Sequence, residues 1–232
     1  MIVPFRGDGD EHRERSWRWV QQWWSVNFPD WTLRSADSGH DPFNRGASRN
    51  VAARAATAPI LIIADADTIP DPEAVCQGVD LVASERAPWV IPYEKLRYYN
   101  LSERATLRRL EFPPDPAITI GEPWDEDDWE HKITSWAGCL ILRRVDYWRA
   151  GGYDERFAGW GGEDNAMQLA LDTLVGPHHR MDSFIQHLSH ARGDADFSHK
   201  GWPANAGLLA QYQRARGKSA AMMRLVTSRD RT

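Results

Sequence analysis

The sequence predicts an α/β fold in which helices flank a mostly parallel central sheet. Residues 60–64 read Ile-Leu-Ile-Ile-Ala, an apolar run typical of a strand that is buried on both faces. Strand and helix patterns alternate through the first 92 residues, and this order gives a right-handed, doubly wound sheet. The 232 residues contain no Gly/Ser-rich linker, internal repeat or block of like charge. We therefore expect one domain over residues 1–232.

The first 92 residues provide the alternating elements. Asp10 and Glu11 place negative charge at the start of a helix pattern, where the helix dipole favours it. Trp19, Trp23 and Trp24 recur at helical spacing, so we expect them to pack against the sheet. The expected strands span 1–5, 31–36, 60–64 and 90–92, and the expected helices span 10–27, 44–57 and 72–84.

The rest of the chain is more irregular. Residues 112–131 contain four prolines and an acidic run, which predict a long irregular loop. After this loop we expect a strand at 134–143, a turn at 151–153, a helix from 163 to about 174, a strand at 180–190, and a terminal helix at 204–216 followed by a basic tail.

The composition argues against several classes of protein. The formal net charge of -5 argues against non-specific nucleic-acid binding. Cys76 and Cys139 are the only cysteines, too few for a disulfide framework or a cysteine-based zinc site. The first residues do not match a signal peptide, and no apolar stretch is long enough to span a bilayer. We therefore expect a cytoplasmic protein without a membrane span.

Two carboxylates follow the apolar strand directly. Side chains alternate along a strand, so Asp65 and Asp67 should point the same way at the carboxyl end, where open α/β sheets bind ligands. Neighbouring carboxylates repel each other unless a cation lies between them, and oxygen ligands suit Mg²⁺ or Mn²⁺. The alternative is a solvated pair that opens a turn before Pro70. The position after a buried strand favours a site for a metal and a diphosphate.

Six short motifs, taken in order, resemble two glycosyltransferase families. They are residues 2–6, 43–45, 65–70, 136–139, 151–153 and 159–164. The first three resemble the β-1,4-galactosyltransferase catalytic domain, and the fourth is similar to a glycine-containing strand of the polypeptide N-acetylgalactosaminyltransferases. The last two resemble an acceptor-site motif that both families share. The resemblance covers residues 2 to about 190 and implies the Rossmann-like GT-A fold.

The resemblance also implies a metal site at the sheet edge. Asp67 would bind the metal, Mn²⁺ or Mg²⁺, and Asp65 would lie nearer the ribose or the sugar. His187 stands where the galactosyltransferases have a metal-binding histidine, and His190 and His199 are competing candidates.

Donor binding is implied for a larger set of residues. These are Pro4, Phe5, Arg6, Asp37, Arg45, Arg49, Asp65 and Gly138. Asp37 would accept a hydrogen bond from the uracil N–H, and its alternative role is that of a turn residue. Arg45 and Arg49 lie one helical turn apart, so they either face the diphosphate together or form a solvated helix face.

Catalysis is expected at the start of a later helix. Glu163 and Asp164 follow Gly161 and Gly162, which allow a ligand to approach the backbone closely. An inverting transfer needs a base that removes the acceptor's hydroxyl proton, and a helix N-terminus favours an ionised carboxylate. By position in the motif, Asp164 would be that base and Glu163 would orient a substrate. Trp160, Gly161 and Gly162 would bind the acceptor, while ordinary helix capping is the alternative role for the two acids.

The expected function is metal-dependent transfer of a hexose or N-acetylhexosamine from a UDP-sugar to a hydroxyl of a glycan or protein. Inversion is expected and retention is the alternative, in a bacterial cell or a phage-infected host. The nucleotide-binding part would span about 1–92 and the acceptor-binding part about 93–216. A nucleotidyltransferase would need a Gly-rich phosphate loop, for which the acidic residues 7–10 are a poor match. A non-catalytic nucleotide-sugar-binding module would not need a positioned base.

Overall fold

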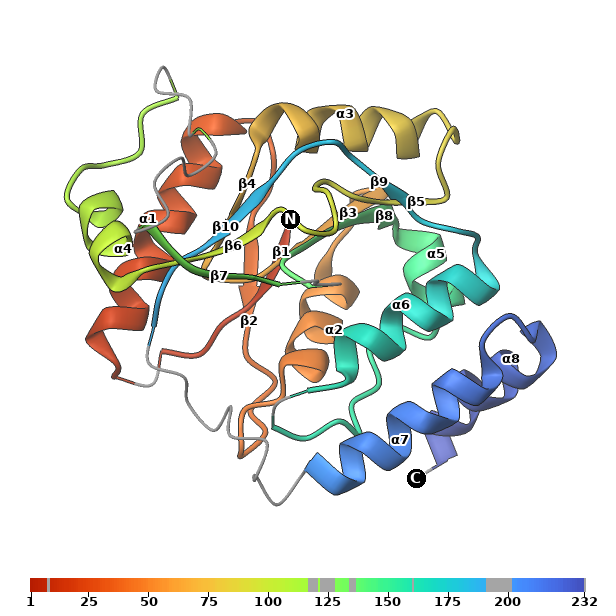
Figure 1. Cartoon of the computed structure of the whole chain (residues 1–232). Helices are drawn as coiled ribbons and strands as arrows, with labels where there is room; N and C mark the ends of the chain where they lie inside the picture. Colours follow the sequence, from red (N-terminus) through yellow and green to blue (C-terminus); the bar gives the residue numbers. More distant parts are fainter. Residues whose placement is uncertain are drawn as a thin grey trace.

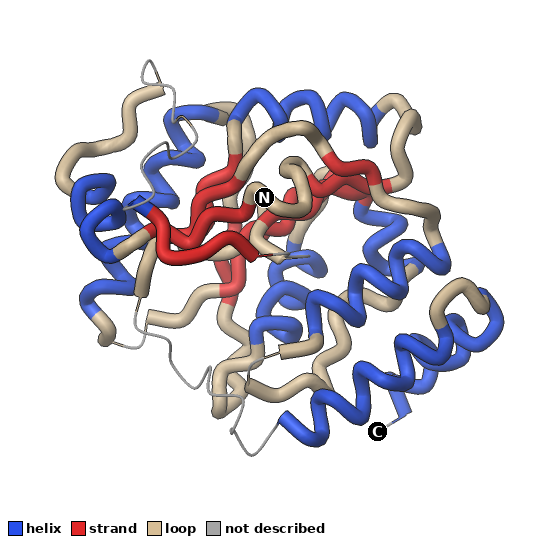
Figure 2. The backbone as a smooth tube through the Cα atoms, viewed as in Figure 1, coloured by secondary structure: helices blue, strands red, loops and turns tan. Residues whose placement is uncertain are grey.

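The computed structural model describes residues 1–7, 9–116, 121, 128–133, 137–159, 161–190 and 202–231. Two sheets lie at the centre with helices around them, so the predicted α/β class is confirmed (Figure 2). Among the helices of these ranges, none is long and apolar enough to cross a membrane.

The larger sheet has six strands in the order β2-β1-β3-β8-β5-β9. They are β2 (Arg34–Ala36), β1 (Ile2–Pro4), β3 (Ile60–Ala64), β8 (Cys139–Arg143), β5 (Trp89–Ile91) and β9 (His179–Arg180). The pairs β1–β2, β1–β3 and β5–β9 are parallel, as predicted. However, β8 runs antiparallel to both β3 and β5, so the sheet is mostly parallel, as expected, and its antiparallel pairs come from a strand that follows the first 92 residues. Ala64 pairs with Cys139, which means that the chain re-enters the sheet at the edge where β3 leaves it.

The smaller sheet has the order β4-β10-β6-β7. Its strands are β4 (Thr68–Pro70), β10 (Ile185–His187), β6 (Tyr98–Leu101) and β7 (Trp129–Ile133). The strand expected at 180–190 is in fact two strands, β9 and β10, which belong to different sheets. In addition, β7 begins inside the loop expected at 112–131, because the prolines of that segment do not extend to its last residues.

The helices are α1 (Glu11–Asn27), α2 (Arg45–Ala55), α3 (Pro72–Ala83), α4 (Glu103–Leu110), α5 (Arg144–Arg149), α6 (Glu163–Leu174), α7 (Trp202–Ala215) and α8 (Ser219–Thr227), before a short 3-10 helix (Ser228–Arg231). Helices α1, α2, α3, α6 and α7 lie near the positions predicted for them, whereas α4, α5 and α8 were not predicted. Asp10, Asn44 and Asp71 begin α1, α2 and α3, and each side chain accepts a hydrogen bond from a backbone N–H of the first turn. The expected basic tail is instead α8, because Met222 and Val226 lie one turn apart and are buried.

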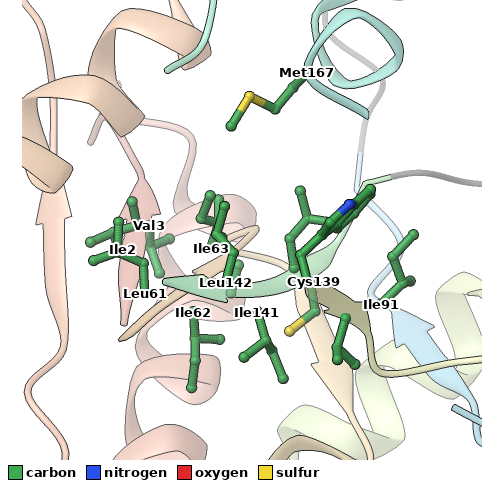
Figure 3. Packing of buried hydrophobic residues seen from close by; sticks show 14 of the residues in the cluster. Ile2, Val3, Leu61, Ile62, Ile63, Ile91, Cys139, Ile141, Leu142 and Met167 are labelled. Atoms are coloured by element: carbon green, nitrogen blue, oxygen red, sulfur yellow. The ribbon is translucent and has the colours of Figure 1, made fainter. Parts of the chain in front are cut away.

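Helices cover both faces of the larger sheet. In Figure 3, Ile62 and Ile141 extend from one side of the strands, and Met167 of α6 lies on the other side. Gly78 lets α3 approach the first of these sides, since a Cβ at that position would lie 2.7 Å from Ile141. This two-sided burial explains the continuous apolar run of β3.

Aromatic residues of α1 enlarge the core. Trp23 and Trp24 are fully buried and contact Phe28 as well as each other. Trp19 is also buried, so the predicted packing of these tryptophans is confirmed. At the other end of the molecule, α7 and α8 pack against α6 (Figure 1).

Candidate functional site

The sheet edge collects residues from four strands. Because β1, β2 and β3 are parallel, Arg6, Asp37 and Asp65 all follow the same ends of their strands. The antiparallel β8 begins at this edge, directly after Gly138. The carbonyl of Gly138 accepts hydrogen bonds from the Asp65 N–H (3.1 Å) and the Thr68 hydroxyl (2.8 Å), which fixes the backbone before Asp67.

Gly138 itself has little room for a side chain. Its φ of +91° lies in the left-handed region, and a Cβ there would lie 3.0 Å from Ile185 and 3.0 Å from Tyr98. Packing against Ile185 and Tyr98 therefore requires a glycine here, while the donor contact predicted for Gly138 stays a prediction.

Asp67 lies between two histidines. Strand β10 pairs with β4 so that His187 is opposite Thr68, and the Leu188 N–H donates to the Asp67 carbonyl (2.8 Å). The Asp67 carboxylate is 3.5 Å from Nε2 of His187 and 3.2 Å from Nε2 of His190. One ligand atom from each of the three side chains lies within 4.8 Å of the other two.

This group has the chemistry of a metal site. Burial alone would raise the pKa of Asp67, but the charge and hydrogen bonds of His187 and His190 hold it well below its ordinary value. The carboxylate is therefore ionised. One carboxylate oxygen and two imidazole nitrogens suit Mn²⁺ better than Mg²⁺, which prefers oxygen ligands. His199, the other candidate, lies outside the described residues, and His178 instead contacts Asp172 at 3.0 Å.

A second group joins α2 to the start of α6. Arg45 forms an ion pair with Glu163, and Arg49 forms ion pairs with Asp65 (2.5 Å) and Asp164 (2.9 Å). The Arg49 side chain is 1% exposed, so the alternative of a solvated helix face is wrong for this residue. Both arginines thus pair with carboxylates of the protein, and the diphosphate contact suggested for them stays a prediction.

The Asp164 carboxyl has a pKa suited to proton transfer near neutral pH. Burial raises it, Arg49 lowers it, Glu163 and Asp65 raise it and Arg45 lowers it, with a result of about 6. The carboxyl is therefore mostly ionised at pH 7 and still basic enough to accept a proton.

Tyr153 belongs to a motif that resembles the acceptor site of the two families, but no role for its side chain was predicted from the sequence. Its hydroxyl donates to Oδ1 of Asp164 (3.2 Å), and its ring lies 4.5 Å from the guanidinium carbon of Arg49. The backbone of Tyr153 is held by Asn50, which accepts from its N–H (3.0 Å) and donates to its carbonyl (2.9 Å). The sequence contains both Gly151-Gly152-Tyr153 and, on α2, Arg49-Asn50. However, nothing in the spacing of these segments indicates that they contact each other.

The predicted base pocket contains a closed ion pair. Arg6 donates to both oxygens of Asp37 (2.6 and 2.8 Å), and these hydrogen bonds lower the pKa of Asp37. The Arg6 guanidinium also lies over the Phe43 ring at 5.1 Å. Phe5 stacks on Trp17 (5.3 Å).

The other predicted residues of this region are placed in part. Pro4 is a buried residue of β1. Gly161 and Gly162 precede α6 with φ values of +100° and +97°. Trp160 lies outside the described residues.

Comparisons with known proteins show what this chain is similar to. A family model described as the N-terminal domain of galactosyltransferase matches residues 121–191. Validoxylamine A glucosyltransferase of Streptomyces hygroscopicus subsp. jinggangensis (strain 5008) is 31% identical over 137 residues, which are 51% of this chain and 32% of the relative. The enzyme of the same name from subsp. limoneus is 31% identical over 137 residues, 51% of this chain and 30% of the relative. The chain thus spans about a third of the length of these curated relatives.

A solved structure shows the same fold. The catalytic domain of Drosophila beta1,4galactosyltransferase 7, solved with xylobiose, aligns with a TM-score of 0.50 over 88% of this chain and 77% of that chain, at 14% identity. The GT-A fold and the resemblance to galactosyltransferases are therefore confirmed.

Proposed function

We propose that this chain is a metal-dependent glycosyltransferase that moves a hexose or N-acetylhexosamine from a UDP-sugar to a hydroxyl acceptor on a glycan or protein. One observation carries the proposal: the segment after β3 reaches both groups of site residues. Asp67 contacts His187 and His190, while Asp65 contacts Arg49, which in turn contacts Asp164. A metal site and a candidate base thus lie on either side of one short segment.

The metal would be held by Asp67, His187 and His190, and this donor set fits Mn²⁺. A divalent cation at this position would neutralise charge on the leaving diphosphate. Asp65 and Gly138 would contact the donor beside it. Arg6 and Asp37 lie at the ends of neighbouring parallel strands, which supports their role at the nucleoside. The name of the Streptomyces relatives supports a hexose as the transferred sugar.

Asp164 would be the base of an inverting transfer. It accepts the acceptor's hydroxyl proton while that oxygen attacks the anomeric carbon, and the bond between the sugar and UDP breaks with its electrons on the diphosphate. Glu163 is held by Arg45 and would orient a substrate at the same helix start. Gly161 and Gly162, with Trp160, would bind the acceptor.

The test is nucleotide release from a panel of UDP-, GDP-, ADP- and dTDP-sugars with Mn²⁺, with and without EDTA. We expect UDP release from one UDP-sugar, lost in EDTA and restored by added Mn²⁺. Full turnover in excess chelator would refute the metal role, and release of GDP from GDP-sugars alone would refute UDP-sugars as donors. Formation of UTP and a sugar 1-phosphate from a UDP-sugar when pyrophosphate is added would indicate nucleotidyl transfer. The anomeric configuration of the product, read by NMR, distinguishes inversion from retention.

A further inference from the structure

We propose that Arg49 and Tyr153 are positioning residues that hold Asp164 through a single oxygen, Oδ1, and leave Oδ2 to take the acceptor's proton. This inference rests on the proposed role of Asp164 as the base. It assigns a function to a buried arginine that the sequence suggested for the diphosphate.

Arg49 acts as a rigid connector between two acids. One terminal nitrogen donates to Oδ1 of Asp164 (2.9 Å), and the other donates to Oδ1 of Asp65 (2.5 Å). The guanidinium is planar with donors at fixed angles, so these bonds set the separation of the two carboxylates. Because the side chain is 1% exposed, it has no room to turn outward to solvent. The donor side of the site and the base are therefore held in one geometry.

Tyr153 fixes the same oxygen from a second direction. Its hydroxyl donates to Oδ1 of Asp164 (3.2 Å), and its ring supports the Arg49 guanidinium at 4.5 Å. Asn50 holds the backbone of Tyr153 by two hydrogen bonds and is the next residue after Arg49 on α2. One helix turn therefore positions both donors of Asp164.

This arrangement leaves the second carboxylate oxygen of Asp164, Oδ2, to accept a proton. Both donors bond Oδ1, and no residue in the described part of the chain hydrogen-bonds Oδ2. In the transfer step, the acceptor O–H bond breaks and an Oδ2–H bond forms, while the acceptor oxygen bonds to the sugar and the diphosphate leaves. Oδ1 keeps its two hydrogen bonds throughout, so the carboxyl does not have to rotate.

The groups around Asp164 decide in which direction its pKa moves when a hydrogen-bond donor is lost. Arg49 and Arg45 face it with positive charge, Glu163 and Asp65 face it with negative charge, and Tyr153 faces it with a neutral hydroxyl. Loss of a donor to Oδ1 makes the ionised carboxylate less favourable. The acidic limb of kcat should therefore move to higher pH.

The first test is Tyr153→Phe, with Tyr212→Phe as the matched control. Tyr212 also donates its hydroxyl to a buried aspartate, Asp154 (2.8 Å), but does not hydrogen-bond Asp164. We expect Tyr153→Phe to lower kcat about 10-fold and to raise the pH of the acidic limb, with UDP affinity and donor KM unchanged. Tyr212→Phe should lower thermal stability alone and keep the wild-type pH profile of kcat.

The second test is Arg49→Lys, which keeps the charge but cannot bond both acids as a fork. We expect kcat to fall about 10- to 100-fold, with a higher donor KM because Asp65 is released as well. Arg54→Lys is the control, since Arg54 lies on the same helix with a 61% exposed side chain. In an Asp164→Asn background, Tyr153→Phe should cause no further loss of kcat, because it acts through that carboxylate. Arg49→Lys should still raise the donor KM in that background, because Arg49 also holds Asp65.

The outcomes separate this inference from the proposed function. Wild-type kcat and pH profile in Tyr153→Phe would overturn the inference, even if Arg49→Lys does not fold. A full additional loss of kcat from Tyr153→Phe in the Asp164→Asn background would overturn it as well. Undiminished transfer by Asp164→Asn alone would instead remove the proposed base.

Discussion

Asp67 is the residue on which the proposed metal site depends most. Asp67→Ala should abolish Mn²⁺ binding and transfer, since the cation loses its anionic ligand. His187→Ala and His190→Ala should each raise the Mn²⁺ concentration required by about 10-fold or more. The matched control is His178→Ala, whose ring contacts Asp172 instead. Free Mn²⁺ measured by electron paramagnetic resonance reports metal binding independently of activity. An unchanged Mn²⁺ affinity in His190→Ala would show that His190 is not a metal ligand.

Substitution of Asp164 should lower the rate of transfer without weakening the binding of UDP. Asp164→Asn keeps the size of the side chain but cannot accept the proton, so kcat should fall about 10²- to 10⁴-fold with little change in UDP affinity. Because the pKa of this carboxyl is about 6, the wild-type kcat should be constant above that pH and fall as the pH drops below it and the base becomes protonated. A kcat that shows no acidic limb between pH 5 and 8 would contradict the assignment.

Single residues were predictable where a motif named them. The resemblance named Asp67 and His187 for one metal site, and the structure brings these two side chains within 3.5 Å of each other, while metal binding by them stays a prediction. His190 was one of several candidates, and only the pairing of β4 with β10 selects it over His178. Tyr153 was named as part of a motif, but its contact with Arg49 was not predicted, because it joins segments more than 100 residues apart and no periodicity relates them.

The turn before α6 depends on a glycine that has no space for a side chain. Gly162 has a φ of +97°, and a Cβ there would lie 2.8 Å from the Phe157 ring. Gly162→Ala should therefore lower the free energy of unfolding by about 1–3 kcal/mol and reduce transfer by displacing Asp164. The control is Gly207→Ala in α7, where nothing lies within 4 Å of the new Cβ. That change should be neutral or stabilise by up to about 1 kcal/mol, and chemical denaturation of both variants measures the difference.

Elements with strong local signals were predicted well. The apolar run of β3 and the capped helices α1, α2 and α3 follow from burial and capping, which the local sequence encodes. The direction of β8 was not predictable in this way, since strand direction depends on where a long connection returns the chain. The division of the expected strand at 180–190 between two sheets has the same cause: it is decided by long-range pairing.

The C-terminal helices belong to the same hydrophobic core as the sheet. Met222 of α8 is fully buried, whereas the next residue, Met223, is 40% exposed. Met222→Ala should cost about 2–5 kcal/mol of unfolding free energy, and Met223→Ala should change it by less than about 0.5 kcal/mol. Denaturation followed by circular dichroism measures both. Equal effects would show that α8 does not contribute to the core.

At the scale of the whole molecule, the site is assembled from the sheet edge, α2, the segment before α6 and the end of β10. The sequence predicted that such a site lies at the strand ends, because parallel strands present their carboxyl ends together. It did not predict the direct contact between α2 and the start of α6, which depends on the packing of helices far apart in the chain.

A crystal structure with Mn²⁺ and UDP tests the central claim most directly. Anomalous scattering locates the cation without any assumption about activity. The predicted result is one Mn²⁺ bound by the Asp67 carboxylate, His187 and His190, with the UDP diphosphate on the same ion and the Asp164 carboxylate facing the space beside it. Mn²⁺ bound elsewhere, or UDP bound away from the end of β3, would contradict the proposed site.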